Sequence, residues 1–380
     1  MTRTASFLFL AAALLGAPAC SAQGLPRDAP ADRAHRNVPA TSGRANLPPA
    51  TQRPFTVQTI GQFDEPFAMN FLPDSSLMVT EKAGRLKVRG ANGSVVAISG
   101  LPAVAKVDQG GLLDVVAAPG FTSNHRIYWT YSESAGQGTQ LAMARGTLTG
   151  RTLTDVAVLW RSGSAGPGGQ FGAVIAFAPD GRSLYLSSGE RQRFTPAQDP
   201  AQKLGKILHL TLDGQPMPGT RDGILTSGHR NPYGLQFARD GRLWEVEMGP
   251  KGGDELNVVV PGRNYGWPIV SNGDNYDGVP INDHPTHPEF EAPKLWWNPS
   301  ISPGALMIYS GAMFPQWRGS AFIAALSGEA LIRVALAGDT ARAVEQWSMD
   351  DRIRDVVQAP DGAIWLLGDD GKLMRLTPRV

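Results

Sequence analysis

Six stretches of this sequence share one pattern, in which an apolar strand, a turn and a second apolar strand follow one another. The turns fall at or near Asp74, Gly120, Asp180, Asp240, Gln316 and Asp361. Successive copies lie about 45 to 75 residues apart, which is the spacing of four-stranded sheets in a repeat array. The pattern therefore predicts an all-β fold, a six-bladed β-propeller of four-stranded antiparallel sheets. A β-sandwich with incidental Asp-Gly turns is the alternative.

The clearest copy is GLQFARDGRLWEVEMG, in which Asp240 and Gly241 predict a two-residue hairpin turn. With 44 Gly and 30 Pro and almost no apolar residues at helical spacing, the chain is interrupted too often for a helical protein. Residues 55–380 have about the length that a closed propeller of this size needs. The 35 Lys and Arg against 34 Asp and Glu give no electrostatic case for binding nucleic acid or an anionic membrane surface.

The N-terminus, residues 1–22, has the features of a signal peptide. Arg3 supplies a positive charge, residues 7–15 form a short apolar core, and residues 17–19 (APA) form a small-residue cleavage region. The apolar core is too short to span a bilayer. We therefore expect an exported protein, which is periplasmic, anchored by lipid to the outer membrane, or secreted.

Cys20 is the only cysteine, so no intramolecular disulfide can form. Its position directly after the apolar core suggests a lipoprotein signal that ends before Cys20, although Ala17 stands where such signals usually have leucine. The alternative is plain cleavage near Ala19 or Ala22. A lipid on Cys20 is the one membrane contact that we expect. Residues 23–54 are rich in Pro, Ala, Arg and Asn and predict a disordered linker.

Two segments close together in the sequence suggest a binding site. Arg230 and Asn231 precede a proline, which holds them in an extended conformation at a strand entrance. The loop from Gly249 to Glu255 (GPKGGDE) combines exposed carbonyl groups with the carboxylates of Asp254 and Glu255. Oxygen ligands of this kind are those that calcium prefers, so the loop predicts a calcium site.

A pair of arginines precedes the last hairpin. Arg352 and Arg354 in DRIRD are two residues apart, so in an extended strand both side chains lie on one face. Two guanidinium groups on one face suit a polyanionic ligand, and Arg230 could converge on the same end of the propeller. The alternative is a set of surface ion pairs with Asp351 and Asp355.

The chain resembles the soluble quinoprotein glucose/sorbosone dehydrogenases, in particular the aldose sugar dehydrogenase branch. The motifs that carry the resemblance are VDQGGLLDVVAAPGF, GHRNPYGL, MGPKGGDELN, GRNYGWP and RIRDV, in the family's order and at compatible spacing. The resemblance covers nearly all of residues 55–380. It implies a six-bladed propeller that carries pyrroloquinoline quinone (PQQ) and calcium and oxidises a small sugar, passing electrons to an external acceptor.

The same resemblance implies roles for individual residues. The expected contacts to the quinone come from Gln109, Arg230, Asn231, Arg352 and Arg354. The expected calcium ligands are the carbonyl oxygens of Gly249 and Pro250 for the cofactor's ion, and Asp254, Glu255 and Tyr265 around a second, structural ion. The expected aromatic wall of the sugar cleft is Trp297. Arginine suits carboxylates because its fork can bind both oxygens.

Three positions depart from the family pattern. Gln170 stands where the family has the histidine general base, and an amide cannot accept a proton at neutral pH. Val174 and Ser327 stand where the family has an arginine and commonly a lysine. A positioned base contributes about two to four orders of magnitude in rate, so its loss would slow the reaction without abolishing it. His229 and Glu190 are the candidates to replace it.

Two functions follow from these residues. The first is an exported quinoprotein that oxidises an aldose or a similar hydroxyl compound by hydride transfer to PQQ. The alternative is a catalytically impaired member of the family that binds a sugar, a quinone or a protein, and a calcium-dependent lactonase-like propeller is a further class. The chain has no C-x-x-C-H haem motif, so the electrons would leave to another molecule.

Overall fold

The computed structural model describes residues 43–166 and 168–379. The predicted signal peptide, Cys20 and the greater part of the predicted linker lie outside these residues. The described helices are short: α1 (Phe121–Asn124) and the 3₁₀ turns η2 (Thr195–Ala197), η3 (His284–Thr286) and η4 (Pro315–Trp317). None of the described helices has the length and apolar character needed to cross a membrane.

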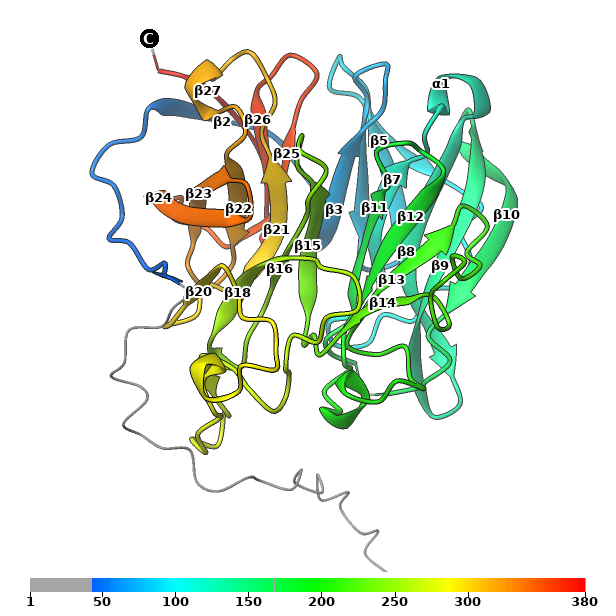
Figure 1. The fold of residues 1–380 in the computed structure, drawn as a ribbon. Coiled ribbons are helices and arrows are strands. Elements are labelled where there is room, and N and C mark those ends of the chain that lie inside the picture. The colour runs from blue at the N-terminus through cyan, green and yellow to red at the C-terminus, as the bar shows by residue number, and fades with distance from the viewer. Residues whose placement is uncertain (1–42, 167, 380) are drawn as a thin grey trace, which may run out of the picture. The chain divides into compact units, whose positions relative to one another are not determined.

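Six antiparallel sheets, one for each blade, form a ring (Figure 1). Blade 1 contains β3 (Pro66–Phe71), β4 (Leu77–Glu81), β5 (Arg85–Arg89) and β6 (Val95–Ile98). Blade 2 contains β7 (Leu112–Ala117), β8 (Arg126–Ala135), β9 (Gly138–Thr149) and β10 (Thr152–Arg161). Blade 3 contains β11 (Gly172–Phe177), β12 (Ser183–Ser188), β13 (Lys206–Thr211) and β14 (Ile224–Ser227).

The second half of the ring has the same plan. Blade 4 contains β15 (Pro232–Phe237), β16 (Leu243–Glu247), β18 (Asp254–Val258) and β20 (Leu295–Trp297). Blade 5 contains β21 (Pro303–Ile308), β22 (Ala321–Ala325), β23 (Ala330–Ala337) and β24 (Thr340–Ser348). Blade 6 contains β25 (Ile353–Gln358), β26 (Ile364–Gly368), β27 (Lys372–Pro378) and, from the other end of the chain, β2 (Phe55–Gln62). A separate two-stranded sheet pairs β17 (Lys251–Gly252) with β19 (Gly273–Asp274).

The predicted propeller is confirmed, and each of the six sequence repeats is the hairpin between the first and second strands of a blade. In four of these hairpins an aspartate Oδ1 accepts the backbone N–H two residues later. These aspartates are Asp74, Asp180, Asp240 and Asp361. The predicted two-residue turn is wrong in length, because Ala238 N donates to Arg242 O and three residues lie between them. Gly241 supplies the left-handed residue, with φ of 84°, that such a three-residue loop requires.

The first strand of each blade is an edge strand, so its outer backbone groups need partners from the neighbouring blade. At each of the six blade junctions a side-chain oxygen accepts a backbone N–H across the junction, and we call these bonds the seam. The acceptor–donor pairs are Asn70–Ala117 (3.3 Å), Asp114–Ile175 (2.7 Å), Asn231–Gly172 (3.1 Å), Gln236–Ile308 (2.7 Å), Gln358–Ser310 (2.7 Å) and Asp355–Met69 (2.7 Å). The seam holds the first strands side by side around the centre of the ring.

The last part of the predicted linker is ordered, which corrects that expectation for the described residues from 43 to 54. The short strand β1 (Gly43–Arg44) adds to blade 4 as a fifth strand, parallel to β20. Ala45 is buried against the core, and Ala50 N donates to Gln346 O of blade 5 at 2.7 Å. These backbone partners explain the order, because they come from strands far away in the sequence.

Candidate active site

The segments that lead into the first strands bring several of the predicted residues together at one end of the ring. We call this set the mouth: Gln109, Gln170, Glu190, Arg230, Asn231, Tyr233 and Arg354. Gln109 Oε1 accepts from the Gln170 backbone N–H at 2.9 Å and from the Tyr233 hydroxyl at 3.4 Å. Blades 2, 3 and 4 are therefore linked at this end through one amide side chain.

Arg230 lies at the centre of the mouth and is only 6% exposed. Its Nη1 donates to Met248 O at 3.0 Å and to Gly249 O at 2.6 Å, and its Nη2 donates to the Gln170 amide oxygen at 2.7 Å. Its buried Nε has no hydrogen-bond partner among the described residues. Leaving a charged donor unmatched in the interior is costly, so this atom points to a ligand.

Gln170 bridges Arg230 and Glu190. Its hydrogen-bonding partners assign the amide oxygen to the Arg230 side and the amide nitrogen to Glu190 Oε1. Glu190 is fully buried, burial raises its pKa, and its Oε2 accepts from the backbone N–H groups of Arg193 and Phe194. Gln170 itself has a φ of 52°, a strained conformation for a residue with a side chain, and such strain concentrates at functional sites.

The two predicted arginines of blade 6 lie on one face and share one carboxylate. Arg352 Nε donates to Asp369 Oδ2 at 3.0 Å, and Arg354 Nη2 donates to Asp369 Oδ1 at 2.7 Å. The alternative pairing is not observed, because Asp351 pairs with Lys372 and Asp355 belongs to the seam. No pattern in the sequence indicated Asp369 as the shared partner.

Lys82 is a further cation that the sequence analysis missed. Burial lowers its pKa, and the charge of Arg354 lowers it further, whereas Asp369 acts in the opposite direction. Burial would raise the pKa of Asp369, but Arg354 and Arg352 hold it below its ordinary value. Three cations therefore surround one carboxylate, which leaves an excess of positive charge beside the mouth.

Arg354 reaches the rest of the mouth through two aromatic rings. Its guanidinium lies 5.6 Å from the Phe67 ring centroid, and Phe67 meets Tyr233 edge-on at 5.7 Å. Burial raises the pKa of Tyr233, while the charges of Arg354 and Arg230 both act to lower it. Cations from blades 4 and 6 are therefore both near Tyr233, as the expected convergence requires.

His229 cannot act as the substitute base in this arrangement, which corrects that prediction. Its side chain is fully buried and stacks on Tyr265 with ring centroids 4.5 Å apart. Nε2 lies 2.9 Å from Thr226 Oγ1 and Nδ1 lies 3.1 Å from Glu247 Oε1, so both nitrogens are engaged. Neither nitrogen is therefore free to accept a proton from a substrate hydroxyl.

The structure also corrects the prediction that Asp254 is a calcium ligand, because backbone N–H groups already occupy both oxygens of its carboxylate. Oδ1 accepts from Gly249 N at 2.8 Å and Oδ2 accepts from Ile301 N and Ser302 N, both at 2.7 Å. Burial raises its pKa to about 6, although these backbone donors oppose the shift. Asp254 therefore ties the Gly249 loop to blade 5 rather than presenting oxygen atoms to a metal.

Glu255 points to the opposite face of β18 and lies in a buried cluster of carboxylates. Glu247 and Glu245 of β16 lie on the same face, and burial, reinforced by the charge of Glu247, raises the pKa of Glu245 well above its usual value. Glu245 Oε1 and Asn257 Oδ1 have no partner among the described residues. Ligand atoms of His229, Glu245 and Glu247 lie within 4.8 Å of one another. The alternation of acids in LWEVE and DELN could have revealed this cluster.

Tyr265 and Trp297 are packed as structural residues. The Tyr265 hydroxyl donates to Val258 O at 2.5 Å and accepts from Val260 N, so only its main-chain carbonyl could serve calcium. Trp297 is 0% exposed and belongs to the core between blades 4 and 5. The expectation that Trp297 lines an open sugar cleft is therefore wrong for this structure.

The two positions that lack the family's cations supply no charge. Val174 packs against the apolar contact between blades 3 and 4. Ser327 Oγ lies 2.8 Å from Ser302 Oγ, next to the segment that binds Asp254. Pro250 is buried beside Gly249, whose carbonyl already accepts from Arg230.

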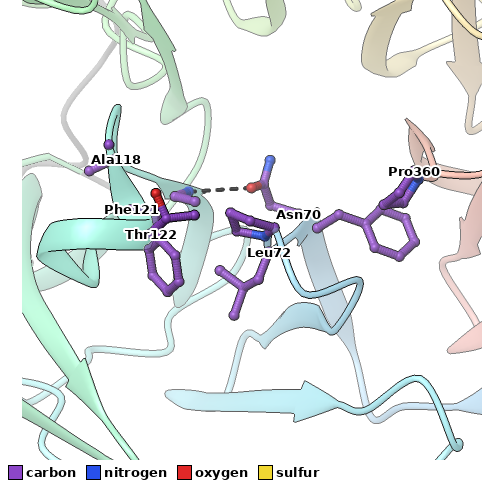
Figure 2. Close-up of a pocket in the computed structure, with 10 residues that line it drawn as sticks. Asn70, Leu72, Ala118, Phe121, Thr122 and Pro360 are labelled. Carbon is purple, nitrogen blue, oxygen red and sulfur yellow. Dashed lines mark hydrogen bonds between the residues drawn. The ribbon is translucent and has the colours of Figure 1, made fainter.

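A cavity of about 440 Å³ lies at the other end of the first strands (Figure 2). It is lined by Asn70, Phe71, Ala117, Phe121 and Pro360, among others, which belong to the hairpin ends of blades 1, 2 and 6. Arg354 and Gln109 lie at the opposite ends of the same strands. The cavity is therefore separate from the mouth.

The chain is similar in sequence and in fold to known sugar dehydrogenases. Residues 63–375 match the family model described as Glucose / Sorbosone dehydrogenase. The chain is 34% identical over 341 residues to aldose sugar dehydrogenase YliI of Escherichia coli K12, with 84% of this chain and 91% of the relative covered. The PQQ-bound form of an aldose sugar dehydrogenase from Streptomyces coelicolor superposes with a TM-score of 0.70 at 25% identity, with 87% of this chain and 100% of that chain covered.

A second solved structure, the apo-form of the soluble aldose sugar dehydrogenase from Escherichia coli, gives a TM-score of 0.79 at 33% identity and covers 86% of this chain and all of the other. The family match runs from the start of blade 1 into β27 of blade 6 and includes every segment that builds the mouth. The chain therefore belongs to the glucose/sorbosone dehydrogenase family.

Proposed function

We propose that this protein oxidises an aldose or a similar hydroxyl compound at its anomeric carbon, with PQQ as the hydride acceptor and calcium as the metal. The main support is Arg230, a buried cation with an unmatched Nε at the point where blades 2, 3 and 4 meet. Family membership and the PQQ-bound relative from Streptomyces coelicolor support the choice of cofactor.

The charges beside the mouth fit a cofactor with several carboxylates. Lys82, Arg352 and Arg354 lie within electrostatic reach of the single carboxylate of Asp369. An anion would relieve the mutual repulsion of these cations, and a guanidinium can bind a carboxylate through two parallel hydrogen bonds. Arg230 would contribute its free Nε–H from the other side. These residues partly compensate for the cations absent at Val174 and Ser327.

The bound quinone supplies an acceptor for a hydride, and the chain must supply an acceptor for the hydroxyl proton. Gln170 cannot accept it, and both ring nitrogens of His229 are already engaged. Glu190 is the nearest carboxylate, and burial raises its pKa, which favours proton uptake. We assign Glu190 as the proton acceptor, reached when the Gln170 side chain moves aside.

Calcium has two candidate positions in blade 4. The carbonyl oxygens of Gly249 and Pro250 are the first, with Arg230 already bonded to Gly249 O. The carboxylate of Glu255 is the second, because it lies beside buried Glu247 and Glu245, and Glu245 Oε1 has no partner among the described residues. Oxygen atoms of this kind are good ligands for calcium, and a cation would offset the repulsion among the carboxylates.

We also propose where the protein acts and which molecule receives its electrons. The N-terminal sequence supports export, followed by a periplasmic, lipid-anchored or secreted protein, and the lipid would be on Cys20. The electrons would pass to an external acceptor.

The test is dye-linked oxidation of a panel of aldoses by protein reconstituted with PQQ and calcium. We expect dye reduction that requires both additions and that a calcium chelator abolishes, together with a fall in melting temperature on chelation. Omission of PQQ alone is the matched control. If PQQ fails to bind at high micromolar concentration, the dehydrogenase is rejected, and a binding propeller becomes the better account.

A further inference from the structure

Tyr276 is the most exposed large apolar side chain of the described residues, at 73%. It stands on a tight loop that follows β19. Asn275 N donates to Val279 O at 3.0 Å and Gly278 N donates to Asn275 O at 2.9 Å. Asp277 Oδ1 accepts from Val279 N at 2.9 Å. The loop therefore has its own internal hydrogen bonds and presents the aromatic ring in a defined place.

This loop is fixed to the mouth. Lys251 of β17 pairs with Asp274 of β19, so the loop is hydrogen-bonded to the segment that directly follows Gly249 and Pro250. The ring centroid of Tyr276 lies 5.9 Å from the guanidinium carbon of Arg230, and the centroid of buried Trp267 lies 5.2 Å from the same atom. Tyr276 is therefore an exposed aromatic ring beside the buried cation at the centre of the mouth.

An exposed aromatic ring next to polar groups is suited to a particular kind of ligand. Its apolar face can cover the C–H face of a sugar ring, while the sugar's hydroxyl groups bond to side chains below it. An isolated exposed hydrophobic side chain needs no explanation, but this one lies against Arg230 at the candidate site. Tyr276 is accessible for such a contact, whereas Trp297 is buried in the core.

We infer that Tyr276 is a specificity-determining residue that stacks on the ring of the aldose and thereby favours cyclic sugars over open-chain hydroxyl compounds. This inference rests on the proposed function for the identity of the substrate. A stack adds binding to the ring in the ground state and in the transition state alike. Its loss should therefore change KM and leave kcat nearly unchanged.

The experiment compares Tyr276→Ala with Tyr276→Phe in the protein reconstituted with PQQ and calcium. We expect the alanine variant to raise KM for aldoses about tenfold with kcat within about twofold of wild type, and the phenylalanine variant to stay within about twofold in both. Val95→Ala, which shortens another exposed apolar side chain, is the matched control and should change nothing. An unchanged KM for Tyr276→Ala, or an equal fall in kcat for both variants, would overturn the inference.

Sugar binding by calorimetry, measured without an electron acceptor, separates this inference from the proposed function. Loss of sugar binding in Tyr276→Ala, in a protein whose wild type binds sugar but reduces no dye, would support the stacking role and reject the dehydrogenase. Equal sugar affinity in wild type and Tyr276→Ala, with dye reduction intact, would reject the stacking role alone. The melting temperature of each variant checks that the loop change has not unfolded the protein.

Discussion

The seam runs between the first strands of all six blades, whereas the mouth lies where the chain enters blades 2, 3, 4 and 6. Apart from Asn231, which belongs to both, their polar groups are used differently. In the seam, each carboxylate oxygen of Asp114 and Asp355 accepts one backbone N–H, at 2.7 or 2.8 Å. In the mouth, Arg230 Nε has no partner among the described residues, and the amide of Gln170 is shared between a cation and a carboxylate.

This difference distinguishes polar groups that stabilise the fold from those that are available to bind a ligand. A matched buried polar group stabilises the junction between two blades, and its hydrogen-bonding capacity is used up. An unmatched one destabilises the empty protein and stabilises a complex. Asp254 and Glu255 repeat the contrast within one strand, because the first is saturated and the second lies among unmatched oxygens.

The largest effect should come from Arg230→Met. Removing a buried guanidinium that binds a carboxylate costs about 2–5 kcal/mol, so we expect the Kd for PQQ to rise at least about 30-fold in a fluorescence titration. Arg239→Met, an exposed arginine at the hairpin end of the same blade, is the control and should bind PQQ normally. Normal PQQ affinity in Arg230→Met would remove the distinction between mouth and seam. Arg230→Lys, which keeps the charge but loses the fork, shows whether geometry matters.

The next effect concerns the pH dependence of stability. Burial raises the pKa of Asp114 to about 7, with Asp355 adding to the shift. Because the folded state keeps this proton to a higher pH than the unfolded state, the contribution of Asp114 to stability is full below about pH 4 and is lost as the pH rises through 7. We expect Asp114→Asn to be about 2 kcal/mol more stable than wild type at pH 8, because it has no carboxyl proton to lose. One pKa unit corresponds to about 1.4 kcal/mol, and part of this gain is offset because the amide has one hydrogen-bond acceptor fewer than the carboxylate.

Denaturant unfolding at pH 5 and pH 8 measures that change. Asp355→Asn is the matched comparison. Burial raises the pKa of Asp355 only to about 6, so its contribution to stability should be lost at a lower pH than that of Asp114. If Asp114→Asn were as pH-dependent as wild type, the carboxylate would not be the source of the slope.

The smallest effect, about 1.4 kcal/mol or more in barrier height, is expected for Gln170→His. An imidazole at this position would lie between Glu190 and Arg230, where Glu190 could orient it as a base. We expect the rate of aldose oxidation at saturating PQQ and calcium to rise at least about tenfold. The measurement is steady-state kinetics after PQQ affinity has been checked.

Glu190→Gln in both backgrounds is the control for that variant. If Glu190 is the proton acceptor of the natural protein, Glu190→Gln should lose activity in the wild-type background. It should lose less activity in the Gln170→His background. Tight PQQ binding with a rate unchanged by the histidine would indicate that an existing group already removes the proton. An unchanged rate in Glu190→Gln would contradict the assignment of Glu190.

The sequence predicted the propeller because its evidence is local. A hairpin needs a turn and two apolar strands within about 20 residues, and the aspartates at 74, 180, 240 and 361 make the same short-range bond in four blades. The grouping of Gln109, Arg230 and Asn231 also followed from motifs, because each precedes or lies near the start of a first strand.

The tertiary structure decided which of these side chains are available. Asp254 is matched by Ile301 and Ser302, nearly fifty positions later, and Trp297 is buried by blade 5. Tyr276 meets Arg230 only because β19 pairs with β17. Burial and hydrogen-bond saturation depend on contacts between distant parts of the chain, and a local pattern of residue types does not contain them.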